Sequence, residues 1–239
     1  YFITAMAPII DQSSIVHHAV LSTVHMANLT PAHLAPEGFD CYYGDGGLTN
    51  LMLAAWGPGM LPLELPEGVG FGMNGGEALI LNIHYFDPGN LEEGIEDQSG
   101  YAFRTTESVD TEAYLATWGP TDIAIPADVE SYTLTQTLPV WEPGAGWDLT
   151  IYSLWPHMHV LGSAYSATAI DSNGDEECIV YSDGYSFENQ YYYAFDEPFV
   201  ATSGSLMSFT CTWNNSTSNP DLLNNPPVPT AYGLNTDEE

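Results

Sequence analysis

The chain has 239 residues, 44% of them hydrophobic and 13% aromatic, which is enough for one large or two medium domains with cores and excludes a mainly disordered protein. Arg104 is its single basic side chain against 32 Asp and Glu, so the formal net charge is −31. This charge repels nucleic acids and anionic membranes and attracts cations. No apolar run reaches the roughly 20 residues of a membrane-spanning helix, so we expect no membrane span.

Short β-strands separated by prolines and glycines are predicted along the whole chain. The opening segment 1–10 has the composition of a strand, and the apolar run from Ala78 to Ile83 is predicted to be a buried strand. Several later segments alternate polar and apolar residues, as strands with one buried face do. These segments are 131–140, 147–155, 164–170, 177–182, 190–195 and 205–213. The pattern favours an all-β fold of antiparallel sandwiches, typically jelly rolls.

Two pauses in the strand pattern suggest how the chain is organised. The segment from Asp171 to Asp175 has the composition of a hairpin turn, and its acidic spacing departs from that of a helix-loop-helix calcium site. A domain boundary is expected within the stretch from Gly119 to Asp128. We therefore predict two β-sandwich domains, residues 1–120 and 121–239.

Five of the seven histidines fall into three compact groups. Neutral imidazole is the commonest protein ligand for copper and zinc, so this grouping predicts metal sites, one in each domain. The groups are His17 with His18, His84, and His157 with His159. The other two histidines, His25 and His33, are interpreted as ordinary core or surface residues.

The spacing of these histidines makes specific demands on the backbone. On a regular strand His157 and His159 would project to the same side, whereas the adjacent His17 and His18 would point to opposite faces. A twist or bulge is therefore needed for both to reach one ion, with His84 as a third ligand. Three imidazoles suit zinc or copper, and a carboxylate or a methionine thioether could complete the pair at 157 and 159. A cupin site is disfavoured, because Tyr165 stands where a cupin would carry a glutamate.

Several segments occur in the same order as in the copper type II, ascorbate-dependent monooxygenases. The chain resembles this family, which includes peptidylglycine α-hydroxylating and dopamine β-monooxygenases, from about Ile3 to Glu239. The segments are VHHAVL, AAWGPG, LPEGVGFGMNGGEALILNIHY, WPHMHVLG, NQYYYAFDEPF and GSLMSFTCTWNNS.

The resemblance implies two jelly-roll-like domains that face each other across a cleft and hold two copper ions. It implies that His17, His18 and His84 bind the copper that stores and passes an electron. It further implies that His157 and His159, with a methionine, bind the copper at which oxygen is activated. Ascorbate would reduce both ions, and a C–H bond of a small organic substrate would be hydroxylated.

The C-terminal end departs from the family pattern. The family's methionine ligand lies in a Glu-Met-Cys stretch, and the chain ends at Glu239, just before the corresponding position. Either the methionine, with a disulfide partner for Cys211, follows Glu239, which we expect, or the second copper site is degraded. Met207 is a poor substitute, because it matches a position that is not a ligand. With Cys41 and Cys178, Cys211 makes an odd total of three cysteines.

A second departure concerns the substrate. Trp155 stands where the peptide-amidating members carry an arginine that holds the peptide carboxylate, and Arg104 is the chain's only basic residue. We therefore expect the substrate to be a neutral or cationic small molecule, bound in an aromatic pocket that includes Trp155. We also expect the protein to be secreted, with an extracellular or periplasmic location. Two alternatives stay open: a structural or self-assembling protein that reuses the fold without catalysis, and a module that scavenges zinc or copper.

Overall fold

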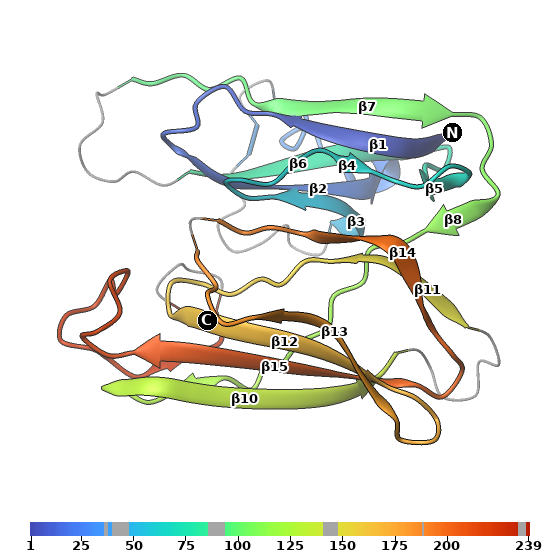
Figure 1. Cartoon of the computed structure of the whole chain (residues 1–239). Coiled ribbons are helices and arrows are strands. Elements are labelled where there is room, and N and C mark those ends of the chain that lie inside the picture. The colour runs from blue at the N-terminus through green and yellow to red at the C-terminus, as the bar shows by residue number, and fades with distance from the viewer. Residues whose placement is uncertain (36–37, 40–47, 86–93, 141–147, 188, 234–237) are drawn as a thin grey trace. The chain divides into compact units, whose positions relative to one another are not determined.

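The computed structural model describes residues 1–35, 38–39, 48–85, 94–140, 148–187, 189–233 and 238–239. Within these ranges the chain forms β-strands and one short 3-10 turn, Met26–Asn28, so the prediction of an all-β fold is confirmed (Figure 1). The chain divides into two compact units, residues 1–116 and 117–239. None of the helical segments in the described ranges is long and apolar enough to cross a membrane.

The first unit contains two sheets that lie one over the other (Figure 1). Its strands are β1 (Phe2–Ile9), β2 (Val16–His25), β3 (Thr49–Trp56), β4 (Leu63–Glu64), β5 (Val69–Gly72), β6 (Glu77–Tyr85), β7 (Gly100–Thr106) and β8 (Thr111–Ala113). One sheet has the order β4-β1-β5-β8, with β7 also paired to β1, and the other has the order β3-β2-β6. All of these pairs are antiparallel except β5 with β8, which is parallel.

Side chains from both sheets fill the interior of the first unit. Met6 of β1, Val24 of β2 and Leu53 of β3 are almost inaccessible to solvent. The run from Ala78 to Ile83 does form a strand, β6, but the prediction that this strand is buried is wrong, because each of its residues keeps some exposed surface. The reason is its position: β6 lies at the edge of its sheet and pairs only with β2 among the described strands.

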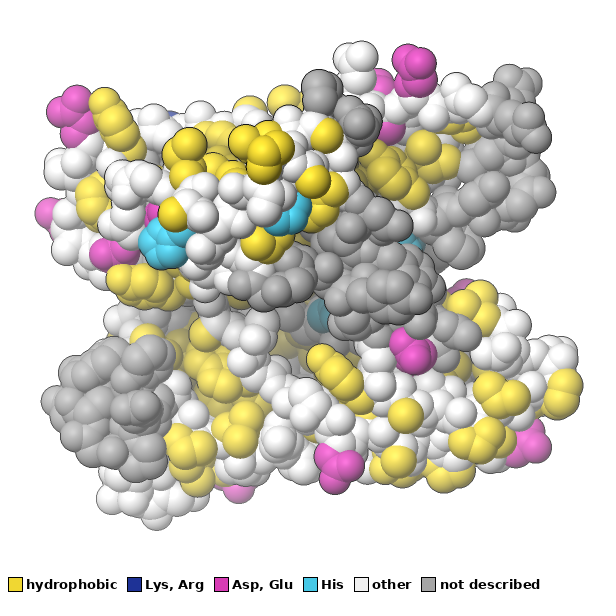
Figure 2. Space-filling view, turned by 180° about the vertical axis from the view of Figure 1, so that it is seen from behind, with side chains coloured by type: hydrophobic (Ala, Val, Ile, Leu, Met, Phe, Trp, Pro, Cys, Tyr) yellow, Lys and Arg dark blue, Asp and Glu magenta, His cyan; other side chains and the backbone are white. Residues whose placement is uncertain are grey.

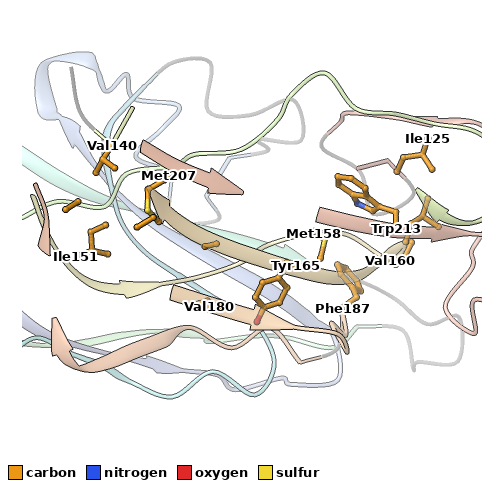
Figure 3. Close-up of a cluster of buried hydrophobic side chains, with 14 residues drawn as sticks. Ile125, Val140, Ile151, Met158, Val160, Tyr165, Val180, Phe187, Met207 and Trp213 are labelled. Carbon is orange, nitrogen blue, oxygen red and sulfur yellow. The ribbon is translucent and has the colours of Figure 1, made fainter. Parts of the chain in front are cut away.

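The second unit is also a sandwich. Its strands are β9 (Ala124–Ile125), β10 (Val129–Pro139), β11 (Leu149–Leu154), β12 (Gly162–Ile170), β13 (Glu176–Ser182), β14 (Tyr193–Ala201), β15 (Leu206–Asn215) and β16 (Thr230–Ala231). A four-stranded sheet has the order β10-β15-β12-β13, and β11 pairs with β14 and β9 with β16. Residues of all three sheets share one hydrophobic core, in which Trp213 and Met207 are each 1% exposed (Figure 3).

Alternation along the strands separates the core of the second unit from its outer face. On β10, Thr133, Thr135 and Thr137 are exposed and hydrogen-bond to hydroxyls of β15. The intervening Leu134 packs against the core. The alternating pattern seen in the sequence thus sets which face of each strand is buried.

The hairpin between β12 and β13 forms at the predicted turn. The Asp171 carboxylate accepts hydrogen bonds from the backbone N–H groups of Asn173 (2.8 Å) and Asp175 (2.9 Å). Gly174 has a φ of 89°, a conformation that glycine adopts without the clash a Cβ would cause. The turn chemistry therefore explains the acidic residues here without a bound cation.

The sole arginine pairs with one of the many acidic side chains. Arg104 on β7 pairs with Glu64 on β4 at 2.5 Å, and its Nε donates to the Thr4 hydroxyl. Figure 2 shows acidic side chains scattered over the visible surface of both units rather than gathered in one patch. No other basic side chain exists in the sequence to neutralise them.

Replacing Leu53 by alanine should lower the free energy of unfolding by about 2–5 kcal/mol, because it removes apolar contacts and leaves a cavity in the first unit. Leu61→Ala is the matched control, since Leu61 is 73% exposed and its loss should cost less than about 0.5 kcal/mol. Urea denaturation followed by fluorescence and circular dichroism measures both. Equal costs at the two positions would contradict the assigned core.

Candidate metal centres

Three histidines of the first unit converge from two neighbouring strands. His18 on β2 lies directly opposite His84 on β6 in the antiparallel register. The register shifts between Val16, which pairs with Tyr85, and His18, so His17 is one extra residue on β2. Such a bulge re-aims a side chain that would otherwise point to the opposite face. The irregularity that the adjacent histidines require is therefore present.

The three imidazoles are close enough to share one ion. One nitrogen from each of His17, His18 and His84 lies within 4.8 Å of the others. The Nδ1 atoms of His17 and His18 are 3.1 Å apart, and the ring centroids of His18 and His84 are separated by 4.5 Å. In a tetrahedral metal site with metal–nitrogen bonds of about 2 Å, two ligand nitrogens are about 3.3 Å apart, close to the separation of these two Nδ1 atoms. The cluster is part-buried: His17 is 8% exposed and the other two are half-buried.

A hydrogen-bonded acidic residue fixes the strand end beside this cluster. The Asp97 carboxylate accepts hydrogen bonds from the Tyr85 hydroxyl (2.9 Å), the Ser99 hydroxyl (2.7 Å) and the backbone N–H of Gln12 (3.1 Å). Desolvation opposes ionisation of Asp97, but the hydrogen bonds from Ser99 and Tyr85 prevail and lower its pKa. Desolvation and the Asp97 hydrogen bond raise the pKa of Tyr85 to about 12. Tyr85, the residue after His84, is thus tied to the segment that precedes β2.

The second pair of histidines lies in the second unit, in the connection between β11 and β12. The expectation that they lie on a regular strand is wrong, because β11 ends at Leu154 and β12 begins at Gly162. Their alternation nevertheless persists: Met158 is buried in the core, while His157 and His159 keep accessible surface. Their ring centroids are 5.1 Å apart and the rings are nearly perpendicular.

Both imidazoles of this pair are oriented through Nδ1. His157 Nδ1 lies 2.7 Å from Oε1 of Gln190, and His159 Nδ1 lies 3.0 Å from the carbonyl oxygen of Glu238. These acceptors favour the tautomer that carries its proton on Nδ1, which makes Nε2 the nitrogen through which each ring would bind a metal. Desolvation of the His157 ring by surrounding protein atoms lowers its pKa to about 4, although the residue as a whole keeps exposed surface. The ring is therefore neutral at pH 7, as a metal ligand must be.

A buried carboxylate holds the backbone of this connection from the core side. Glu239, 7% exposed, accepts hydrogen bonds from the backbone N–H groups of His159 (3.1 Å) and Leu161 (2.8 Å). It also accepts one from the indole N–H of Trp213 (2.7 Å). Desolvation raises the pKa of Glu239 to about 7 in spite of these donors. The carboxyl group thus holds the backbone of His159 in place.

The remaining predicted site residues have different surroundings. The ring of Trp155 lies 5.5 Å from that of His157, and its indole nitrogen is buried without a hydrogen-bond partner among the described residues. Met207 lies in the core, as expected of a residue that is not a ligand. Cys178 and Cys211 are free thiols here, and burial raises the pKa of Cys211 to about 11. Cys41 lies outside the described residues, so the pairing of Cys211 beyond residue 239 stays a prediction.

Sequence reasoning did not single out two residues that orient the second pair. Gln190 lies within the NQYYYAFDEPF segment, but a lone glutamine carries no signal of its own. Glu239 is one of 32 acidic residues, and only its burial against Trp213 distinguishes it. The other two histidines lie outside both candidate sites. His25 is exposed at the end of β2, and His33 is half-buried and accepts a hydrogen bond from the backbone N–H of Thr30.

The donor sets fit copper or zinc. In the first unit three neutral nitrogen donors with no carboxylate among them suit borderline-soft transition metals rather than calcium or magnesium. In the second unit two imidazoles provide part of a site that needs at least one further donor. Within the described part of the chain, the group of His17, His18 and His84 is the only set of three or more His, Cys, Asp or Glu side chains that converges in this way.

Comparison with known proteins gives one distant similarity. No protein-family model matches the chain. In an alignment 108 residues long that covers 41% of this chain, the sequence is 29% identical to peptidyl-glycine alpha-amidating monooxygenase B of Xenopus laevis. The matched region spans 12% of the length of that protein. The chain is therefore distantly related to a monooxygenase.

Replacing Gln190 by leucine should weaken metal binding at the second pair about 10- to 100-fold, because His157 loses the acceptor that fixes its ring. Competitive titration of copper(I) against a chromophoric chelator measures the affinity, with circular dichroism as a check on folding. Gln98→Leu is the control, since only the backbone N–H of Gln98 takes part in a described hydrogen bond. Unchanged affinity in a folded Gln190→Leu protein would contradict the positioning role.

Glu239 should make stability depend on pH between about pH 4.5 and pH 7. Its carboxyl loses its proton near 4.5 in the unfolded chain and near 7 in the folded chain, so the folded state holds the extra proton in this window. The free energy of unfolding should therefore fall as the pH rises through it, by on the order of 3 kcal/mol.

Glu239→Gln does not titrate and should lack this contribution. The measurement is the difference in the free energy of unfolding between the two proteins at about pH 5 and about pH 8, because this difference cancels the repulsion among the other acidic groups. A difference that stays constant over this range would mean that Glu239 has an ordinary pKa.

Proposed function

We propose that the protein is a copper-dependent monooxygenase that hydroxylates a C–H bond of a small organic molecule with oxygen and ascorbate. The observation that carries the proposal is the convergence of His17, His18 and His84 on one point, made possible by the bulge in β2. The pair His157 and His159 in the other unit supplies a second, separate set of nitrogen donors. The distant similarity to an amidating monooxygenase supports the same class of reaction.

In this proposal each unit holds one copper ion through imidazoles. When bound, copper supplies one-electron transfer and activation of oxygen, which protein side chains alone do not provide. His17, His18 and His84 would hold the ion that stores an electron. His157 and His159 would hold the second ion together with at least one further donor.

The protein keeps the second pair of ligands neutral and oriented. Gln190 and the carbonyl of Glu238 fix the two rings through Nδ1, and the low pKa of His157 keeps that ring unprotonated at neutral pH. The Glu239 carboxyl group fixes the backbone between them and β12. Hydrogen bonds of this kind fix the tautomer and the orientation of each ring, so Nε2 of both rings would be available to a metal.

The proposed substrate is neutral or cationic. Arg104 is the only side chain able to pair with a substrate carboxylate by two hydrogen bonds, and it is engaged with Glu64 in the first unit. Trp155 lies against His157 and offers an aromatic surface there. A net charge of −31 attracts cations and repels anions, and it suits secretion into a salty medium where repulsion is screened.

A second candidate function is metal binding without catalysis. It is favoured by the incomplete donor set around His157 and His159 within the described residues, where only one group of three converging ligands occurs. A protein of this kind would scavenge copper or zinc, or would use the fold for self-assembly. Copper-loaded protein that binds metal without consuming oxygen in the presence of ascorbate would favour this function.

The monooxygenase proposal predicts that His84→Ala and His157→Ala each abolish ascorbate-dependent hydroxylation while the fold persists. The assay follows oxygen uptake and product formation with copper-loaded protein and a panel of phenols, aryl amines and glycine-extended peptides. His33→Ala should retain activity, because His33 lies outside both histidine groups. Turnover of the glycine-extended peptides in preference to the other classes would overturn the proposed substrate class, and full activity of His157→Ala would overturn the mechanism.

A further inference from the structure

An open pocket in the second unit lies beside the connection that carries His157 and His159. Its volume is about 270 Å³. The lining residues come from that connection, from β12, β13 and β14, and from the segment between β13 and β14. They are Pro156, Tyr165, Ser182, Gly184, Tyr185, Ser186, Asn189, Tyr191 and Tyr193.

The wall of this pocket is rich in hydroxyl groups and has no formal charge among its described residues. Tyrosine and serine hydroxyls both donate and accept hydrogen bonds, and the Asn189 amide does the same through two different atoms. Burial raises the pKa of Tyr165 and Tyr185, so these phenols stay neutral throughout the working pH range. The wall thus offers mainly neutral polar groups, and the accessible aromatic ring beside them is that of Tyr191.

Several of the tyrosines are held in place before any ligand arrives. The Tyr185 hydroxyl donates to the carbonyl oxygen of Met158 and accepts from its N–H at 3.1 Å. Tyr165 and Tyr193 hydrogen-bond through their hydroxyls. The Tyr185 ring packs against the backbone of Gly162, and a side chain at this position would prevent that contact, because a Cβ would lie 2.9 Å from the ring. Tyr191, by contrast, is 51% exposed and leaves its ring accessible to a ligand.

The pocket and the second histidine pair share two stretches of chain. Pro156 lines the pocket and the next residue, His157, belongs to the pair. Asn189 and Tyr191 line the pocket, while Gln190 between them points away and hydrogen-bonds to His157. A ligand in the pocket would therefore contact the same stretch of chain that carries Gln190, the residue that orients the His157 ring.

We propose that this pocket binds the ring of a neutral sugar. Sugar hydroxyls need neutral partners that both donate and accept, which the polar wall provides, and the C–H face of a sugar packs against an aromatic ring such as that of the exposed Tyr191. The volume lies just below the range of about 300–1,000 Å³ typical of drug-sized ligands, which suits a single ring. Anionic ligands are disfavoured, because the chain's single Lys or Arg side chain, Arg104, pairs with Glu64 in the first unit.

Saturation-transfer NMR on the metal-free protein tests the proposal, so that its outcome does not depend on copper or on catalysis. The probes are D-glucose, D-galactose, D-mannose and N-acetyl-D-glucosamine, with glucuronate and choline as anionic and cationic comparisons. We expect at least one neutral sugar to bind with a Kd on the order of 1 mM, as is usual for a ligand of about a dozen heavy atoms.

Two variants locate the binding. Tyr191→Ala and Asn189→Ala should each weaken the binding of that sugar about fivefold or more. Tyr181→Ala is the matched control, because Tyr181 is an exposed tyrosine on β13 that does not line the pocket, and it should bind as the parent does. Circular dichroism establishes that each variant is folded.

Three outcomes would overturn the proposal: binding of choline or glucuronate in preference to every neutral sugar, no saturation transfer to any of the four sugars, or equal binding by the parent and both pocket variants. A protein that binds a sugar but never consumes oxygen would leave this inference intact and contradict only the monooxygenase. Conversely, a copper-loaded enzyme active on an amine or a phenol with no sugar binding would contradict only this inference.

Discussion

The first candidate metal site depends on one extra residue in a β-ladder. Without the insertion of His17 between the pairs Val16–Tyr85 and His18–His84, adjacent histidines would face opposite sides of the sheet. With it, three imidazoles meet in a part-buried position on two strands that many backbone hydrogen bonds hold. The bulge thus brings three side chains of two regular strands to one point, and the pairing of β2 with β6 sets the spacing of their nitrogens.

The second pair is organised by different means. His157 and His159 lie in an irregular connection, where no ladder fixes them, and side chains and carbonyls from distant segments take over that task. The buried carboxyl of Glu239 anchors the backbone, and Gln190 orients a ring. The residues on either side of Gln190, Asn189 and Tyr191, line the pocket proposed to bind a sugar. The second histidine pair and this pocket are therefore connected through one segment of the chain.

Strand positions and the alternation of buried and exposed residues could be predicted from the sequence, because period-two patterning and turn residues such as Asp171 and Gly174 act locally. The edge position of β6 could not, since the apolar run at 78–83 is equally compatible with a central strand and pairing order is a property of the whole chain. The histidine groups were visible by composition, and the need for a bulge followed from the adjacency of His17 and His18. The roles of Gln190 and Glu239 were hidden, because they arise from contacts across 33 and 80 residues of sequence.

The edge position of β6 would also affect how an ion enters or leaves the first candidate site. Among the described strands, His84 stands on an outer strand of its sheet, while His17 and His18 stand on the central one. Parts of a protein open locally at a lower free energy than that of unfolding the whole domain, and a strand paired on one side has fewer interactions to lose. Transient fraying of β6 would detach a single imidazole and leave the other two in place, so an ion could be passed to or from a carrier stepwise while the sandwich remains folded.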